Sequence, residues 1–217
     1  MHAISPTEAL ARDLKPATIV DQAETAAGSP TRQHTALHVA RRRLNVLAGH
    51  RARITGRLLE SGHLGAPDLM VVLQRKAGRR WLTVARSHTR GGGRFAINYV
   101  AHTPRSEVVR VRFPGDALAE SSTRRVGRLN VYRAVDASWY GGGGSLACGG
   151  ELTSSTLGVA NRTLPCGTMV ALRYGGRSVT VPVVDRGPFV AGREFDLTEA
   201  TKRELGFEGT GVVWSTR

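Results

Sequence analysis

The chain has 217 residues, a formal net charge of +14 and only two cysteines. Its length suggests one large domain or two small ones. We expect no membrane span, because no apolar run approaches the ~20 residues that crossing a bilayer requires. The first thirty residues also lack the apolar core of a secretory signal peptide.

The positive charge is concentrated in the middle of the chain. Residues 46–133 carry a net charge of +12, whereas residues 1–45 carry +2 and residues 134–217 are neutral. Such a block indicates attraction to an anionic partner. Nucleic acid is one candidate, but the sequence has no recognition-helix motif, zinc ligand set or base-stacking signature. An anionic cell wall or membrane surface fits the charge equally well.

Residues 1–43 are predicted to form a disordered or partly helical tail or linker. The segment is polar, contains three prolines, and has too few apolar residues to form a core. The basic triplet at 41–43 ends this tail and is typical of a solvated face or a membrane-proximal anchor.

Residues 44–133 are predicted to form a β-sandwich. Six or seven short apolar or alternating runs recur at a spacing of roughly ten residues and are separated by turns. The order of Gly-Arg-Leu, a Trp-containing strand, Gly-Arg-Phe and Arg-Val-Arg-Phe-Pro-Gly-Asp resembles immunoglobulin-like modules of bacterial surface proteins. Since such modules are usually spacers or adhesive units, we assign no chemistry to this segment.

Residues 134–217 are predicted to contain strands at 169–174, 177–184 and 211–214 and one short helix. Asp196 is the predicted N-cap of this helix, with Glu199 three positions further on as in a capping box. Gly206 is expected to end the helix.

Asp185 is the leading candidate for a catalytic residue. It follows the β-branched run 179–184 and precedes Arg-Gly-Pro, whose glycine and proline force a turn. A carboxylate at such a boundary is held on one side by a strand and exposed on the other. The alternative is a turn-capping acid that only binds neighbouring backbone N–H groups.

Cys148 and Cys166 lie eighteen positions apart in a loop-rich segment. This arrangement suggests a structural disulfide, which would stabilise the fold by ~3 kcal/mol and indicates an oxidising compartment. Two buried free thiols are the alternative. No further ligands lie close enough to predict a metal site.

Four motifs in the last 84 residues carry a family resemblance. Ala-Ser-Trp-Tyr-Gly, Thr-Leu-Pro-x-Gly-Thr, Val-x-Asp-Arg-Gly-Pro-Phe and Gly-Arg-x-Phe-Asp-Leu occur in this order. They resemble the catalytic domain of rare lipoprotein A (RlpA-like) septal lytic transglycosylases, and the paired cysteines resemble the actinobacterial type. The resemblance implies a six-stranded double-psi β-barrel for residues 134–217. The expected fold class is therefore mainly β, an immunoglobulin-like sandwich followed by this barrel with one short helix.

The resemblance also implies an activity, namely cleavage of peptidoglycan glycan strands to 1,6-anhydro-muramoyl products. Asp185 is the expected general acid and base, and Glu151 is the best match to a second catalytic acid of the family. No metal or cofactor is expected. Nucleic acid is then the disfavoured partner, and the expected location is the cell envelope or the extracellular space, with an export signal not visible in this chain.

The expected substrate-binding residues surround these acids. Tyr140 and Trp139 can stack on a sugar ring. Neighbours in a strand face opposite sides, and Trp139 is the one predicted to lie in the core. Arg186 and Arg193 can pair with substrate carboxylates or, as is commoner, brace Asp185 and Asp196.

Asn161 stands where the family commonly has His. Asn can hydrogen-bond a sugar or orient a carboxylate, but it cannot carry a proton at neutral pH. The alternative function is therefore a non-catalytic, expansin-like protein that binds or remodels the cell wall.

Overall fold

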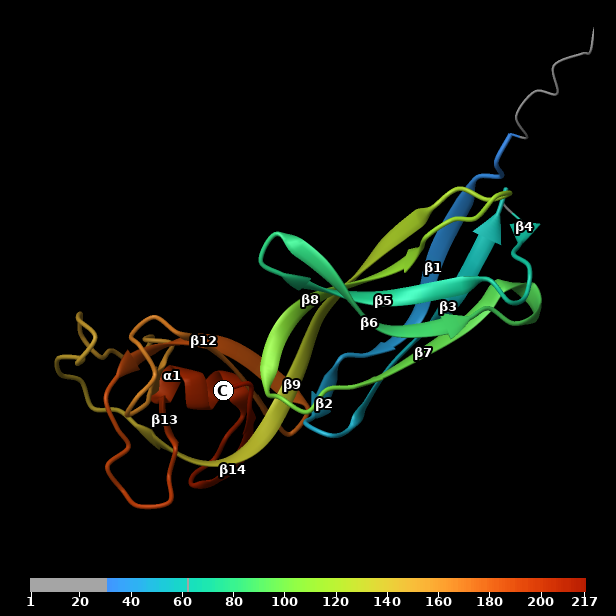
Figure 1. Ribbon diagram of the computed structural model, residues 1–217. Helices are drawn as coiled ribbons and strands as arrows, with labels where there is room; N and C mark the ends of the chain where they lie inside the picture. The colour runs from blue at the N-terminus through green and yellow to red at the C-terminus, as the bar shows by residue number, and fades with distance from the viewer. Residues whose placement is uncertain (1–30, 62) are drawn as a thin grey trace, which may run out of the picture. The chain divides into compact units, whose positions relative to one another are not determined.

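The computed structural model describes residues 31–61 and 63–217, which form mainly β-structure with one α-helix (Figure 1). The predicted mainly β class is confirmed. The first group of elements is β1 (Thr35–Arg43), β2 (Asn45–Leu47), β3 (Arg51–Glu60), β4 (His63–Leu64), β5 (Met70–Ala77), β6 (Arg80–His88), the 3₁₀ turn η1 (Gly91–Gly93), β7 (Arg94–Val100), β8 (Arg105–Phe113) and β9 (Ser122–Tyr140). The second is β10 (Val159–Ala160), β11 (Met169–Tyr174), β12 (Arg177–Asp185), β13 (Phe195–Thr198), α1 (Glu199–Leu205) and β14 (Gly211–Ser215).

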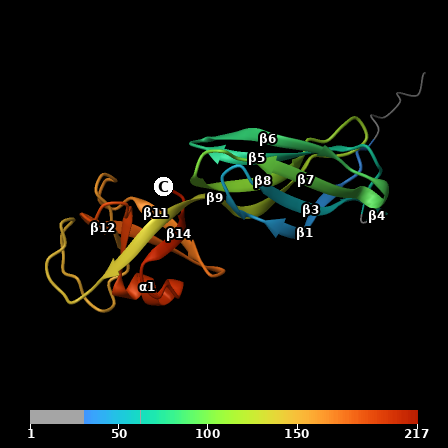
Figure 2. The ribbon, with the colours of Figure 1, turned by 90° about the horizontal axis from the view of Figure 1, so that it is seen from below.

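Residues 35–133, here called the two-sheet region, bury one hydrophobic core between two sheets (Figure 2). One sheet contains β1, β3, β4 and β7, and the other contains β6, β5, β8 and the first part of β9 in that order. Burial alternates along β3 and β8, as expected for strands with one face toward a core. Buried side chains from both sheets include Leu58, Leu73, Ile97 and Val109.

Strand β1 corrects the predicted extent of the N-terminal tail. It pairs antiparallel with β3, from Thr35 opposite Glu60 to Arg43 opposite Arg53, and it buries Leu37 in the core. The sequence of β1 is too polar to indicate this strand locally, because its pairing depends on β3. The remainder of the predicted tail, residues 1–30, lies outside the described residues.

Strand β9 is 19 residues long and belongs to both halves of the structure. Its first part pairs antiparallel with β8, and its last part pairs with β14 and β13. The chain therefore passes the predicted boundary between residues 133 and 134 within a continuous strand.

The end of β9 and strands β10 to β14 form a double-psi β-barrel-like domain around a second hydrophobic core. Strand β13 pairs in parallel with β9, and β10 pairs in parallel with β12, whereas the other neighbouring strands of the barrel pair antiparallel. Its fully buried residues include Leu172, Phe195, Leu197 and Leu205. The predicted strands at 169–174, 177–184 and 211–214 are confirmed to within one residue.

Helix α1 begins two residues later than predicted. Its N-cap is Thr198, whose hydroxyl accepts a hydrogen bond from the Thr201 N–H, so the assignment of this role to Asp196 was wrong. Asp196 still belongs to β13, where its carboxylate accepts from the Ser138 hydroxyl. Gly206 ends the helix in the left-handed conformation (φ 68°), as predicted.

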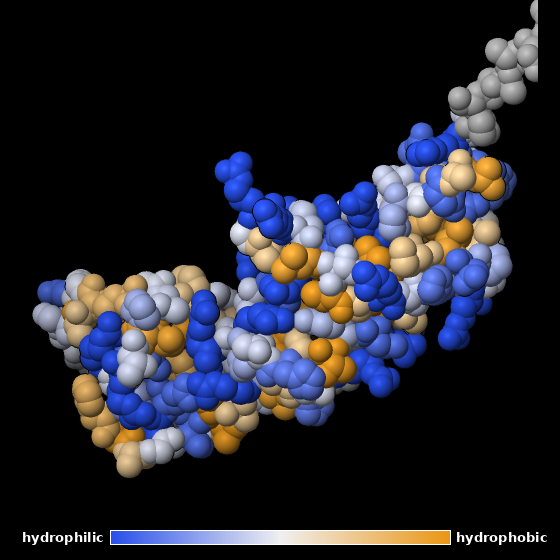
Figure 3. Space-filling view, viewed as in Figure 1, coloured by the Kyte–Doolittle hydropathy of each residue, from blue (hydrophilic) through white to orange (hydrophobic). Residues whose placement is uncertain are grey.

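No helix in residues 31–61 and 63–217 is long and apolar enough to cross a bilayer. On the surface seen in Figure 3, hydrophilic side chains separate the apolar ones into small patches.

Candidate active site

Asp185 is the last residue of β12 and is half-buried. Its Oδ1 accepts hydrogen bonds from the backbone N–H groups of Ala147 (2.9 Å) and Arg186 (2.8 Å). No described residue donates a normal hydrogen bond to its Oδ2. One carboxylate oxygen is thus fixed by the backbone, while the other is available to a bound molecule.

The disulfide between Cys148 and Cys166 is present, which confirms the predicted pairing. It joins the loop 145–151 to the turn that precedes β11. Backbone hydrogen bonds attach both segments to β12, from Cys148 to Val184 (3.2 Å) and from Gly167 to Val183 (2.8 Å). The loop that donates to Asp185 is therefore held against the end of β12.

Glu151 lies on this same loop, in a short bridge with Ser145. Its side chain is exposed, and its carboxylate makes no hydrogen bond or ion pair with the described residues. The structure thus brings the Glu151 loop to Asp185 through Ala147 and leaves the Glu151 carboxylate facing solvent.

Tyr140 and Trp139 lie on opposite faces of β9, as alternation predicts, but the assignment of Trp139 to the core was wrong. Trp139 is 40% exposed, and the ammonium group of Lys202 lies 3.8 Å from the centre of its ring. Tyr140 is the inward member. Its hydroxyl is buried without a hydrogen-bond partner among the described residues.

The Tyr140 hydroxyl faces two carboxylates. Burial raises its pKa well above the usual value, and the charge of Asp185, a hydrogen-bonding approach to the same carboxylate and the charge of Asp196 raise it further. Its proton is therefore retained at physiological pH. The protonated hydroxyl lies close enough to Asp185 to donate to its carboxylate, although not in normal hydrogen-bond geometry, and it can donate to a ligand bound there instead.

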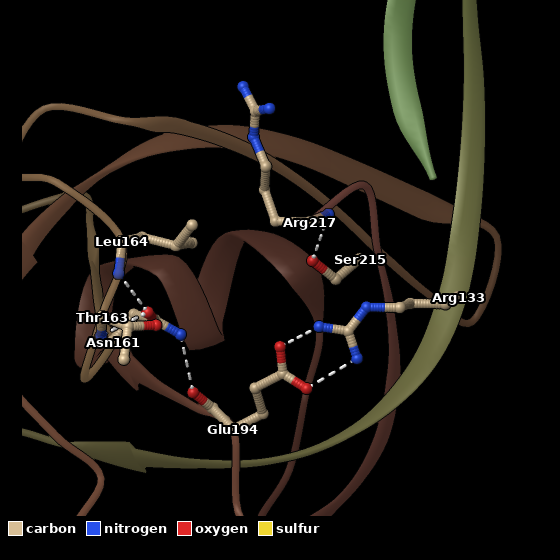
Figure 4. Close-up of polar contacts among 7 residues, drawn as sticks. All are labelled: Arg133, Asn161, Thr163, Leu164, Glu194, Ser215 and Arg217. Carbon is tan, nitrogen blue, oxygen red and sulfur yellow. Dashed lines mark hydrogen bonds and ion pairs between the residues drawn. The ribbon is translucent and has the colours of Figure 1, made fainter. Parts of the chain in front are cut away.

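Asn161 is only 5% exposed, and its side chain is bonded both to its own loop and to Glu194 (Figure 4). Its side-chain oxygen accepts from the N–H groups of Thr163 (3.1 Å) and Leu164 (2.8 Å), and its amide donates to the Glu194 carbonyl (3.1 Å). The backbone N–H of Asn161 donates to the Asp185 carbonyl (3.1 Å). These contacts make Asn161 a brace for the turn beside Asp185 rather than a group exposed to substrate.

Glu194 extends this brace to β9. Its carboxylate pairs with both terminal nitrogens of Arg133, as Figure 4 shows. Bidentate pairs of this kind fix side-chain geometry as well as adding energy. The turn that contains Asn161 is thus connected through Glu194 to the strand that carries Tyr140.

The two arginines expected near the acids differ in their contacts. Arg186 donates to the carbonyls of Asn161 and Leu164 (3.1 Å each) and to the sulfur of Cys166 (3.0 Å). It braces the loop backbone instead of a carboxylate. Arg193 is half-buried, and its guanidinium makes no ion pair with a described carboxylate.

Phe189 is a candidate site residue that the sequence reasoning missed. It lies four positions after Asp185 and is 83% exposed, and the adjacent Val190 is 51% exposed. Arg162 holds the base of this loop through a hydrogen bond to the Pro188 carbonyl (2.9 Å). Its position in Asp-Arg-Gly-Pro-Phe was visible in the sequence, but its exposure was not.

Residues 132–214 match the protein family described as Lytic transglycolase. The chain is 43% identical over 82 residues to the "Probable endolytic peptidoglycan transglycosylase RlpA" of Aquifex aeolicus, a match that covers 36% of each chain. It is 43% identical over 102 residues to the protein of that name from Synechocystis, covering 41% of this chain and 32% of the relative.

The "Endolytic peptidoglycan transglycosylase RlpA" of Neisseria meningitidis serogroup A is 40% identical over 83 residues, covering 36% of this chain and 35% of the relative. The chain thus spans about a third of the length of these relatives. Among solved structures, the Streptomyces papain inhibitor matches with 28% identity and a TM-score of 0.33, covering 38% of this chain and 91% of that one.

Proposed function

We propose that this chain, whose residues 132–214 belong to the RlpA-like family, is a lytic transglycosylase that cleaves the glycan backbone of peptidoglycan to 1,6-anhydro-muramoyl products. The observation that carries the proposal is the Asp185 carboxylate, fixed by two backbone N–H groups at the end of β12 with its second oxygen available. It lies inside the segment shared with relatives named as peptidoglycan transglycosylases.

The reaction needs a proton for the leaving oxygen and stabilisation of an oxocarbenium-like transition state. Asp185 donates its proton to the glycosidic oxygen as the bond to the muramoyl C1 breaks. The C6 hydroxyl of the same sugar then attacks C1, and its proton returns to Asp185. One carboxyl group therefore serves as acid and then as base, and no activated water is consumed.

Tyr140 and Glu151 support this chemistry in different ways. The Tyr140 hydroxyl keeps its proton and donates a hydrogen bond to the substrate beside Asp185. The exposed Glu151 carboxylate stabilises positive charge that develops on the sugar ring. The disulfide and the Ala147 contact hold its loop at the site.

Replacing Asp185 tests the proposal directly. Purified peptidoglycan is incubated with the chain, and anhydro-muropeptides are measured by mass spectrometry. We expect product from the wild type and none above background from Asp185→Asn, because a carboxamide has no acidic proton to transfer to the leaving oxygen. Asp136→Asn is the matched control, since Asp136 is an exposed acid of the same domain, and it should retain full activity.

A non-catalytic, expansin-like role in wall binding is the second candidate. It is favoured by Asn161, which occupies the place of the family's common His and is buried within its own loop, so no protonatable side chain exists there. Retention of the wild-type chain on peptidoglycan without any anhydro product would support this role and reject the enzymatic one.

We also infer the roles of the remaining parts of the chain. Residues 44–133 act as an immunoglobulin-like module distinct from the barrel of residues 134–217, and their basic side chains hold the chain to an anionic wall or membrane surface. The two sheets over one core and the net charge of +12 in residues 46–133 support this role. The protein then works in the cell envelope or outside the cell, and its paired cysteines support the actinobacterial type.

A further inference from the structure

The sheet formed by β6, β5, β8 and β9 presents a dense group of cations on its outer surface, here called the arginine face. On β8, Arg110 and Arg112 alternate with the buried residues Val109 and Val111. Because neighbours in a strand face opposite sides, these two arginines point away from the core. The arginine face consists of Lys76, Arg86, Arg110, Arg112, Arg125 and Arg128.

Strand register places these cations beside one another. Arg110 lies directly opposite Arg125, and Arg112 lies two residues further along β8. Strand β5 lies between β8 and β6, and its Val72 is directly opposite Arg112 on one side and Arg86 on the other. These two arginines are therefore one strand apart. Neighbouring strands lie about 4.8 Å apart, and like charges directly opposite each other destabilise a sheet.

No carboxylate compensates the arginine face. Within residues 31–61 and 63–217, none of its six cations forms an ion pair. Glu107, the one acid on β5, β6 and β8, points inward and is paired with Arg75 and Arg105. Burial and, secondarily, the charge of Arg112 lower the pKa of Arg110. The fold thus retains a repulsive cluster, which an anionic ligand would relieve.

We propose that the arginine face binds a linear phosphodiester polymer of the cell wall. Five of its six cations are arginines, whose planar guanidinium groups fit phosphate oxygens in bidentate geometry better than the compact ammonium of lysine does. The choice of a wall polymer as the source of phosphodiesters rests on the proposed function, which directs the barrel to peptidoglycan.

Other anionic partners fit this surface less well. Trp81 is the one aromatic side chain that the strand register places on this face, and the Arg110 guanidinium occupies one side of its ring at 4.1 Å. Stacking of successive nucleic acid bases relies on several free aromatic rings, which this face does not offer. Among the apolar residues that share this side of the sheet, Val72 is buried, Val108 is half-buried and Met70 is 39% exposed, so the cations surround little apolar surface. An interfacial membrane site usually adds a larger apolar contact.

The test measures binding of the full chain to purified poly(glycerol phosphate). Arg125 and Arg128 are exposed and form no side-chain hydrogen bond or ion pair with the described residues, so Arg125→Glu with Arg128→Glu should leave the fold intact. We expect this double variant to lose at least about tenfold in affinity, and wild-type affinity to fall steeply with added salt.

Arg51→Glu with Arg53→Glu is the matched control. These two arginines are exposed on β3 of the other sheet, and the double variant changes the net charge by the same amount. It should retain affinity within about twofold. Equal losses in the two double variants would show that net charge alone drives binding, and would overturn the assignment to the arginine face.

Three other probes test the chemistry of the partner. Polyglutamate, a double-stranded DNA oligomer and vesicles with anionic lipid should each bind more weakly than poly(glycerol phosphate), and tighter binding of any of them would reject the proposal. Asp185→Asn should bind the polymer like the wild type. Failure of the glycan-cleavage assay would therefore not be confused with failure of this binding assay.

Discussion

At the scale of single residues, the site combines a carboxylate fixed by the backbone with a hydroxyl that keeps its proton at neutral pH. Asp185 receives two N–H donors on one oxygen, and Tyr140 brings a buried, unpartnered hydroxyl toward it. The cost of burying an unpaired hydroxyl is about 1–3 kcal/mol. In the proposed mechanism, a substrate oxygen that accepts from Tyr140 removes this cost when it binds.

Tyr140→Phe tests the role of this hydroxyl. Losing one hydrogen bond to the substrate, about 1.4 kcal/mol, should lower kcat/KM roughly tenfold. Tyr174→Phe, at the far end of β11, should leave kcat/KM unchanged. Equal kcat/KM for Tyr140→Phe and the wild type would remove Tyr140 from the proposed mechanism.

The raised pKa of Tyr140 also predicts an effect of pH on stability. In the unfolded chain the phenol ionises near pH 10, whereas the folded protein keeps the proton to higher pH. The free energy of unfolding should therefore fall as the pH rises above about 10. Urea unfolding at pH 8 and pH 10.5 should show a smaller fall in Tyr140→Phe than in the wild type.

Phe189 is predicted to hold a sugar ring or its acyl group near Asp185. Because the ring is 83% exposed, Phe189→Ala should leave stability nearly unchanged but raise KM several-fold, through the loss of about 1 kcal/mol of aromatic contact. Phe189→Trp should restore KM, since a larger ring offers the same kind of surface. An unchanged KM in Phe189→Ala would exclude this contact.

At the scale of elements, the loop 145–151 is the part that most needs external support. It contains two adjacent glycines, Gly149 and Gly150, and carries Glu151 and the Ala147 donor. The disulfide and the backbone contacts to β12 supply that support. Glycine residues lose much conformational entropy when a loop becomes ordered. The covalent link from Cys148 to the turn before β11 reduces the freedom of the loop and so keeps Ala147 and Glu151 near Asp185.

Removing the disulfide should reduce both stability and activity. Cys148→Ala with Cys166→Ala should lower the free energy of unfolding by about 3 kcal/mol, as expected for a loop of this length, and should lower the rate of anhydro-muropeptide formation. The wild type under reducing conditions should match the double variant in both urea unfolding and activity. A fully active double variant would show that β12 alone positions the loop.

At the scale of the whole molecule, charge and chemistry are separated along the chain. Residues 46–133 carry a net charge of +12, whereas residues 134–217, which contain Asp185, are neutral. Electrostatic attraction to a polymer is weakened by salt, whereas contacts in a half-buried site are affected much less. The basic residues of 46–133 should therefore increase the rate of cleavage most when the substrate is an insoluble, anionic wall.

This separation predicts that salt affects the cleavage rate of intact walls more than the cleavage rate of short soluble glycan chains. Raising the salt concentration from 50 to 200 mM should slow cleavage of intact, polymer-bearing walls, with a smaller effect on short soluble glycan chains. The ratio of the two rates, measured by release of anhydro products, should fall. A ratio independent of salt would show that the basic residues do not assist wall cleavage.

The sequence by itself determined the mainly β class, the strands around Asp185, the helix stop at Gly206 and the pairing of Cys148 with Cys166. These features depend on local patterns such as β-branched runs and turn residues, or on motifs that keep their order along the chain. Asp185 was chosen as the catalytic candidate because the sequence shows a predicted strand that ends at Arg-Gly-Pro.

Only the tertiary structure decided the features that depend on distant partners. Alternation places Trp139 and Tyr140 on opposite faces of β9, but which face is inward depends on strands β13 and β14 that pair with it. Strand β1 exists because β3 pairs with it, and Asp196 remains in a strand because β13 continues to Thr198. The exposure of Phe189 and the clustering of the arginine face likewise result from packing and register, which no local pattern encodes.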